Sequence, residues 1–197
     1  PKIPPGSTAK RTSFTTGSLF HRESVTLAEL YLELEDWISV RDRAIAENLL
    51  QFRTLGTSKR VCREVVSRLK TLSPEELEFL IESNHREQAY LLWLAICRRY
   101  NFIADFAVEV LRERLLSLKT DLSHEDFDSF FNRKSDWHSE LDEIRPATRK
   151  KLRQVLFKML READLLTAGN MINAAMPSPR LIDLIMLCMG NFTDVEG

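Results

Sequence analysis

The stretch that decides the fold is RPATRKKLRQVLFKMLR, residues 145–161, which holds seven basic residues and no acidic one. At about 100° per residue in a helix, its apolar side chains share one arc: Leu152, Leu156, Met159 and Leu160. The opposite arc holds Lys150, Lys151, Lys158 and Arg161, with Gln154 among them. This pattern predicts an amphipathic helix that buries one side and exposes a basic stripe to solvent.

An earlier segment repeats this partition. Residues 57–72, TSKRVCREVVSRLKTL, carry five basic residues against one acidic residue. The apolar arc is formed by Val61, Val65, Leu69 and Leu72, and the opposite arc by Lys59, Arg60, Arg63 and Lys70. When the two segments are laid over each other, Lys59 aligns with Lys150 and Arg60 with Lys151. We therefore predict two helices of the same kind.

Each basic helix follows another helix that carries acidic and aromatic residues, Asp36 to Leu50 in one case and Ser123 to Phe131 in the other. A helix, a connector and a basic amphipathic helix make up a helix-turn-helix, whose second helix enters the major groove of DNA. The second connector, residues 132–144, is long for a tight turn and favours a winged-helix variant. A short strand or wing is possible at residues 170–175.

Helical periodicity dominates the chain, so we expect an all-α, compact, multi-helix globular protein with two helix-turn-helix or winged-helix-like units around long central helices. Capping patterns mark two helix starts, at Ser73 to Glu76 and at Ser123 to Asp126. The expected organisation is a flexible basic arm at 1–17, a helical unit at 18–72, central helices at 73–119 and a second helical unit at 120–197. We expect all of these parts to pack as one globular body.

The net charge of the chain and the distribution of its charges point to different ligands. The chain has 28 Lys and Arg against 29 Asp and Glu, a formal net charge of −1, which by itself argues against nucleic-acid binding. However, eight acidic residues lie within residues 120–143 and offset the two basic segments only in the sum. Because phosphates respond to charges within a Debye length, the local stripes decide the electrostatics of binding.

Several function classes find no support in the sequence. Its longest apolar run, Ala89 to Cys97, is too short to span a membrane. Three distant cysteines exclude a disulfide framework and suit a reducing, cytoplasmic location, and the four histidines lack metal-ligand spacing. We interpret Ser123 with His124, and Asp136 with His138, as surface or capping residues. We therefore expect no enzyme activity, no metal and no cofactor.

The leading hypothesis is a non-enzymatic subunit that binds double-stranded DNA and is a monomer on its own. The residues expected to neutralise phosphates are Lys59, Arg60, Arg63, Lys70, Lys150, Lys151, Lys158 and Arg161. Those expected near base edges are Ser58, Arg149 and Gln154. Two alternatives remain open: the stripes dock an acidic partner protein, or the helices bind RNA.

The chain also resembles the BrxA family, a core component of the bacterial BREX (bacteriophage exclusion) systems. The resemblance runs from Thr16-Gly17-Ser18-Leu19 through Glu47-Asn48-Leu49-Leu50, residues 57–72 and 87–113, to TRKKLRQVLFKMLREADLL at residues 148–166. It implies an all-helical protein that binds double-stranded DNA in phage defence and that contacts other BREX subunits. One departure is Asp164, at a helix exit where glycine is common in winged-helix domains.

Overall fold

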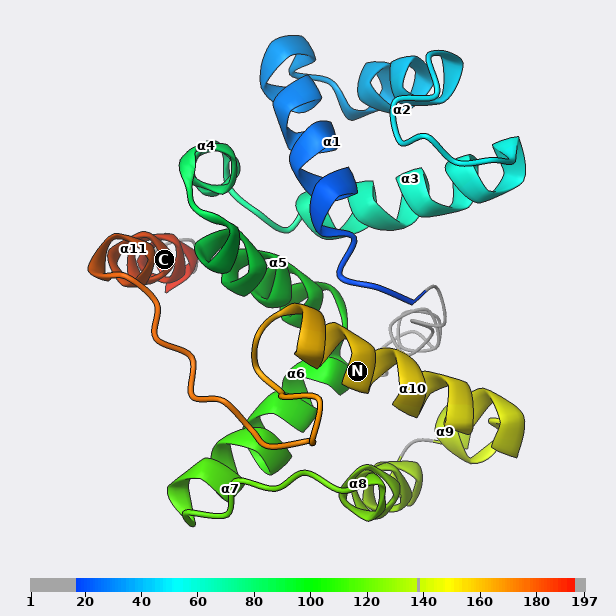
Figure 1. Ribbon diagram of the computed structural model, residues 1–197, viewed down its shortest axis with the longest axis vertical. Coiled ribbons are helices and arrows are strands. Elements are labelled where there is room, and N and C mark those ends of the chain that lie inside the picture. Colours follow the sequence, from blue (N-terminus) through cyan, green and yellow to red (C-terminus); the bar gives the residue numbers. More distant parts are fainter. Residues whose placement is uncertain (1–16, 138, 194–197) are drawn as a thin grey trace, which may run out of the picture. The chain divides into compact units, whose positions relative to one another are not determined.

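The computed structural model describes residues 17–137 and 139–193, and within them the fold is all-α (Figure 1). The expected basic arm therefore lies, apart from Gly17, outside the described residues. The first helices are α1 (His21–Leu34), α2 (Trp37–Ala46), α3 (Leu55–Leu69), α4 (Pro74–Glu82) and α5 (His85–Arg99). They are followed by α6 (Asn101–Phe106), the π-helix η2 (Ala107–Arg112), α7 (Glu113–Leu116), α8 (His124–Ser135), α9 (Ser139–Asp142), α10 (Pro146–Glu162) and α11 (Pro179–Thr193). Within this described part of the chain, no helix is long and apolar enough to cross a membrane.

The chain divides into two compact units. Within the described residues, one contains Phe20–Ala95 and residues 175–193, and the other contains Ile96–Ala174 and residues 17–19. We call them the α3 unit and the α10 unit after their basic helices. The backbone passes between them three times, and one passage falls inside α5. Sequence reasoning placed its boundaries at residues 72 and 119 because helical periodicity continues across α5 without a break.

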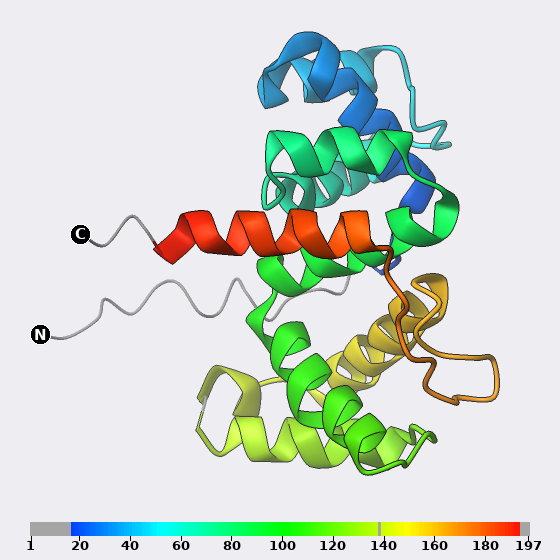
Figure 2. The same ribbon diagram turned by 90° about the vertical axis from the view of Figure 1, so that its left-hand side faces the viewer.

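In the α3 unit, α1 packs against α2, α3 and α4, and α2 packs against α3. The core of this unit includes Leu27, Val40, Ala44, Val65 and Leu69, all inaccessible to solvent. The last helix, α11, lies alongside α4 and α5 (Figure 2). Arg180 pairs with Glu82 at 2.7 Å, and the Ser178 hydroxyl donates to Glu87 at 2.8 Å. These contacts hold the start of α11 against α4 and α5.

In the α10 unit, a cluster of phenylalanines joins α8 to α6. The rings of Phe102 and Phe106 contact those of α8 with centroid distances between 5.1 and 6.1 Å, mostly edge to face. The α8 members of the cluster, Phe127, Phe130 and Phe131, are all buried. These aromatic side chains are therefore core residues of the α10 unit. The two predicted capping boxes, at Ser73 and Ser123, are confirmed.

The C-terminal end of α10 is closed by Asp164, which adopts the left-handed conformation at φ 58° despite not being glycine. The Leu165 N–H donates to the Leu160 carbonyl at 2.9 Å, and the Asp164 N–H donates to the Arg161 carbonyl at 3.1 Å. These two bonds form a Schellman motif, which satisfies carbonyls that the helix leaves open. Isolated antiparallel bridges then join Leu166 to Ile172 and Asp121 to Met171. The winged-helix variant itself stays a prediction.

Two glycines give a matched test of packing. A Cβ on Gly17 would lie 2.5 Å from the Cγ2 of Val155, a stiff side chain that is 2% exposed in α10, whereas a Cβ on Gly56 would meet nothing within 4 Å. Gly56, which sequence reasoning placed in a connector, lies in the first turn of α3 because Thr54 caps that helix. We expect Gly17→Ala to lower the free energy of unfolding by about 1–3 kcal/mol. Gly56→Ala should leave it unchanged or raise it by up to about 1 kcal/mol. Urea denaturation checks both variants, and equal effects would contradict the close approach.

Candidate nucleic-acid interface

The apolar and basic sides of α10 separate as the sequence predicts. Its apolar arc is buried, with Leu152, Leu156, Met159 and Leu160 at most 1% exposed. Its opposite arc is exposed and consists of Lys150, Lys151, Gln154, Lys158 and Arg161, which we call the α10 stripe. Within the described residues, Lys150 and Lys151 form no ion pair. The α10 stripe therefore presents positive charge that no carboxylate among the described side chains neutralises at these two positions.

The other two arginines along the body of α10 have a different role. Arg149 donates from Nε to Asp128 of α8 at 3.0 Å and from Nη1 to the Asn132 side chain at 2.7 Å. Arg153 pairs with the same Asp128 carboxylate. The guanidinium of Arg149 also lies over the Phe131 ring, 4.6 Å from its centroid. These contacts hold α10 against α8, so we leave Arg149, which sequence reasoning placed near base edges, out of the proposed surface.

The C-terminal end of the α10 stripe is tied to its surroundings. Arg161 donates to the Asn170 side chain at 2.7 Å, so the segment after α10 is linked to the stripe. Lys158 lies 3.6 Å from Glu162, whose carboxylate also accepts bonds from the Ser18 hydroxyl and the Leu19 N–H. Because Glu162 shares its charge among these donors, Lys158 is only partly neutralised and remains 55% exposed.

The matching surface in the α3 unit is exposed in the same way. Lys59, Arg60, Arg63 and Lys70 are exposed and form what we call the α3 stripe. Its first three members form no ion pair with any described residue, and Lys70 interacts electrostatically with Asp36. Val61, Val65 and Leu69 on the opposite side are at most 3% exposed. The partition predicted for this helix is therefore confirmed.

Two residues of α3 differ from what their sequence position suggests. Ser58, expected near base edges, is only 2% exposed, and its Oγ is buried without a hydrogen-bond partner among the described residues. It faces the core because it lies in the same helical arc as Val61, Val65 and Leu69. This burial removes Ser58 from the surface that could meet DNA. Arg68, one of the five basic residues of the segment, is 3% exposed, pairs with Glu64 at 2.8 Å and lies over the Phe20 ring.

Two of the residues interpreted as surface or capping residues, Ser123 and His124, have structural roles. The Ser123 hydroxyl caps α8 by accepting from the Asp126 N–H at 3.1 Å, and the His124 ring packs edge to face on Phe157. Burial raises the pKa of the Cys97 thiol to about 12, which keeps it protonated at neutral pH. His138 lies outside the described residues. Within the described ranges, no group of three or more His, Cys, Asp or Glu side chains could hold a metal ion.

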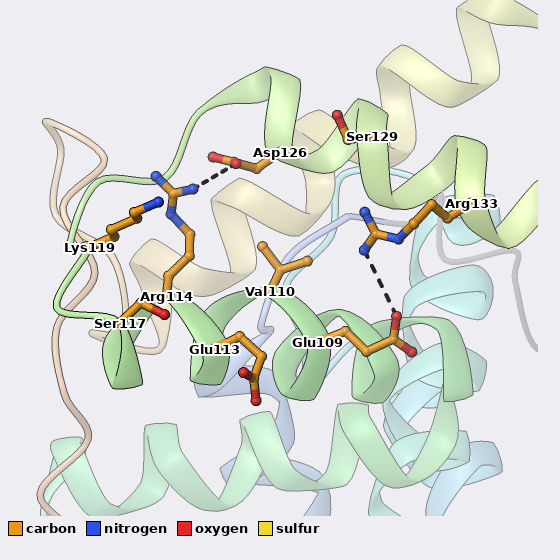
Figure 3. A pocket seen from close by; sticks show the side chains of 9 residues that line it. All are labelled: Glu109, Val110, Glu113, Arg114, Ser117, Lys119, Asp126, Ser129 and Arg133. Atoms are coloured by element: carbon orange, nitrogen blue, oxygen red, sulfur yellow. Dashed lines mark hydrogen bonds and ion pairs between the residues drawn. The ribbon is translucent and has the colours of Figure 1, made fainter.

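A pocket of about 230 Å³ lies in the α10 unit between the η2–α7 segment and α8 (Figure 3). Arg114 occupies its wall and pairs with Asp126 and Asp121, both at 2.8 Å. Arg133 lies 4.0 Å from Glu109 across the opening. Because these charges pair with each other, the pocket lining fastens α8 to the preceding helix. The helix α8 is the one whose Asp128 pairs with Arg149 and Arg153 of α10.

Comparison with known proteins identifies the family. The model of the BrxA family matches residues 11–187, nearly the whole chain. The chain belongs to the BrxA family. It is therefore a BrxA family protein of BREX phage defence, as the sequence resemblance implied.

Curated BrxA relatives agree with this assignment. The BREX protein BrxA of Escherichia coli O9:H4 (strain HS) is 29% identical over 147 residues, which are 75% of this chain and 69% of that protein. BREX protein BrxA of Bacillus cereus (strain H3081.97) is 27% identical over 143 residues, 73% of this chain and 70% of that protein. The crystal structure of an uncharacterized protein from Magnetospirillum magneticum shares the fold. It has a TM-score of 0.77 at 19% identity and covers 93% of this chain and 95% of that one.

Proposed function

We propose that this BrxA family chain is a non-enzymatic subunit that binds double-stranded DNA through the α3 and α10 stripes. The observation that carries the proposal is the agreement between the two stripes. Lys59 and Arg60 take the positions of Lys150 and Lys151, and all four are exposed and without ion pairs in the described part of the chain. A single basic helix face is usually just solvated. Two equivalent faces, each on the far side of a helical unit's core, are better explained by a shared ligand of negative charge.

The dimensions of the two helices suit the major groove of duplex DNA. A helix is about 10–12 Å across with its side chains, and the major groove of B-form DNA is about 12 Å wide. With 17 residues in α10, the helix is about 25 Å long, enough for its stripe to follow the groove for several base pairs. The contacts of Asp128 with Arg149 and Arg153 fix α10 on α8 and so reduce the entropy lost on binding.

The two alternatives make different demands. The major groove of A-form RNA is deep and too narrow for side chains to read, so a helix stripe suits duplex RNA poorly. An acidic partner protein, including another BREX subunit, would use the same cations without needing a nucleic acid. We propose that such docking accompanies DNA binding by a chain that is a monomer on its own.

Competition separates these three ligands. We expect a fluorescent DNA duplex bound to the full chain to be displaced by unlabelled duplex DNA, and much less by duplex RNA of the same sequence. In parallel, BREX subunits captured with the tagged chain should be tested before and after nuclease digestion. Displacement by RNA as effective as by DNA would support the RNA alternative. Absence of any duplex binding, with subunits retained after digestion, would replace the proposal by protein docking.

A further inference from the structure

The two stripes carry matching cations at their edges but differ at their centres, and Ser67 stands in α3 where α10 has Lys158. Across an arc of about 100°, the α10 stripe runs in the order Lys150, Arg161, Gln154, Lys158, Lys151. In the same order, α3 and its C-cap residue hold Lys59, Lys70, Arg63, the half-buried Ser67 and Arg60. The middle position is thus Gln154 in one helix and Arg63 in the other. Each is the ninth residue of its helix, counted from Pro146 and from Leu55.

The middle of a stripe has a different environment from its edges when a helix lies in a groove. Side chains at the edges of the arc point toward the two walls, where the phosphates lie, and side chains at its centre point toward the floor, where base edges are exposed. Both central residues are exposed, and neither forms a hydrogen bond or ion pair with the rest of the described chain. Their polar groups are therefore free to bond to a ligand. Arg149, by contrast, is engaged with Asp128.

Chemistry gives the two central residues different partners. A glutamine amide offers one donor and one acceptor that match N7 and the N6 amino group of adenine, whereas an arginine offers two donors that match N7 and O6 of guanine. Gln154 carries no charge, so a phosphate contact would gain little from it. Its place among four cations is explained if it meets a base.

We propose that Gln154 and Arg63 are the residues that determine base preference, with the α10 unit favouring an adenine and the α3 unit a guanine in the major groove. This inference rests on the proposed DNA binding and assigns to Arg63 a base contact in place of a phosphate contact. It predicts that the two helical units prefer different bases, although the cations at the edges of their stripes are nearly identical. Lys59 and Lys150 at the edges serve as matched references.

Selection from a pool of short duplexes with a randomised centre tests the inference on the full chain. We expect the bound fraction to be enriched in one position that requires adenine and in another that requires guanine. Gln154→Ala should abolish only the first preference and Arg63→Ala only the second, each losing at least about fivefold discrimination at that position. Lys59→Ala and Lys150→Ala should weaken binding equally for all sequences and lower the salt slope by about 1.

The possible outcomes are distinguishable. If duplexes bind without any enrichment, or if Gln154→Ala and Arg63→Ala behave like the two lysine variants, base reading is wrong while DNA binding stands. If the chain retains no duplex from the pool, the proposed function itself fails. Circular dichroism of each variant confirms that the helices are intact, which is expected because both side chains are exposed.

Discussion

Reversing Lys150 and Lys151 to glutamate is expected to weaken duplex DNA binding by about 100-fold or more. Each lysine is proposed to donate a charge-assisted bond to a phosphate, and losing two such bonds at about 1.5 kcal/mol each gives this factor before the added repulsion. The fold should persist, because both side chains are exposed and neither forms an ion pair with the described residues. Fluorescence anisotropy with a labelled duplex measures the affinity, and circular dichroism measures the helix content.

A control with the same change in net charge isolates the position of the charges. Arg112 and Lys119 lie in the same unit on another helix and its C-terminal turn, are exposed, and form no ion pair with other described residues. Their joint reversal to glutamate should change affinity only through the weak long-range charge, by less than about tenfold at physiological salt. Equal losses in the two double variants would mean that net charge, and not the α10 stripe, governs binding.

Replacing Asp128 by alanine is expected to lower the free energy of unfolding of the α10 unit by about 2–3 kcal/mol. The Asp128 carboxylate pairs with Arg149 and Arg153, whose side chains are 26% and 20% exposed, so its removal leaves two half-buried guanidinium groups without their anion. Fully buried pairs lose about 3–5 kcal/mol in this situation, and partial exposure reduces the cost. Thermal and urea denaturation measure the loss.

Asp136, at the C-terminal end of the same helix, provides the matched control. It is exposed and forms no ion pair with the described residues, so Asp136→Ala changes the net charge identically but should alter stability by no more than about 0.5 kcal/mol. A similar loss in both variants would show that Asp128 does not hold α10 on α8. DNA affinity adds a second readout, because Asp128→Ala raises the net charge and any loss of affinity must come from a misplaced helix.

The sequence predicts much of this structure because the helical period and the capping residues act locally. The Ser73 and Ser123 capping boxes and the burial of Leu152 and Leu156 follow from spacing alone. Spacing alone does not predict which basic residues are exposed without a partner and which pair with carboxylates. Those roles depend on partners that are distant in sequence. Arg149 lies next to Lys150, yet Arg149 pairs with Asp128, 21 positions earlier, and Lys150 does not.

The same limit explains the boundaries of the two units, whereas the burial of Ser58 follows from spacing. Ser58 is polar, but it lies in the same helical arc as Val61, Val65 and Leu69 and is buried with them. Residues after Ala174 belong to the α3 unit because of contacts such as that of Ser178 with Glu87. These contacts join segments that are far apart in the sequence, so no local pattern predicts them. For the candidate site, the spacing of residues predicts the two exposed stripes. The structure adds that Ser58 and Arg149 serve the packing of the protein and lie outside the proposed DNA-binding surface.

The salt dependence of binding tests the central claim most directly. If the two stripes together engage about six phosphates, the logarithm of the association constant should fall with the logarithm of salt concentration at a slope near −5, a loss of about 10³ between 50 and 200 mM salt. Anisotropy titrations of the full chain with one duplex at these two concentrations give the slope. Binding that is absent at the lower salt concentration, or that does not change between the two, would contradict DNA binding through the α3 and α10 stripes.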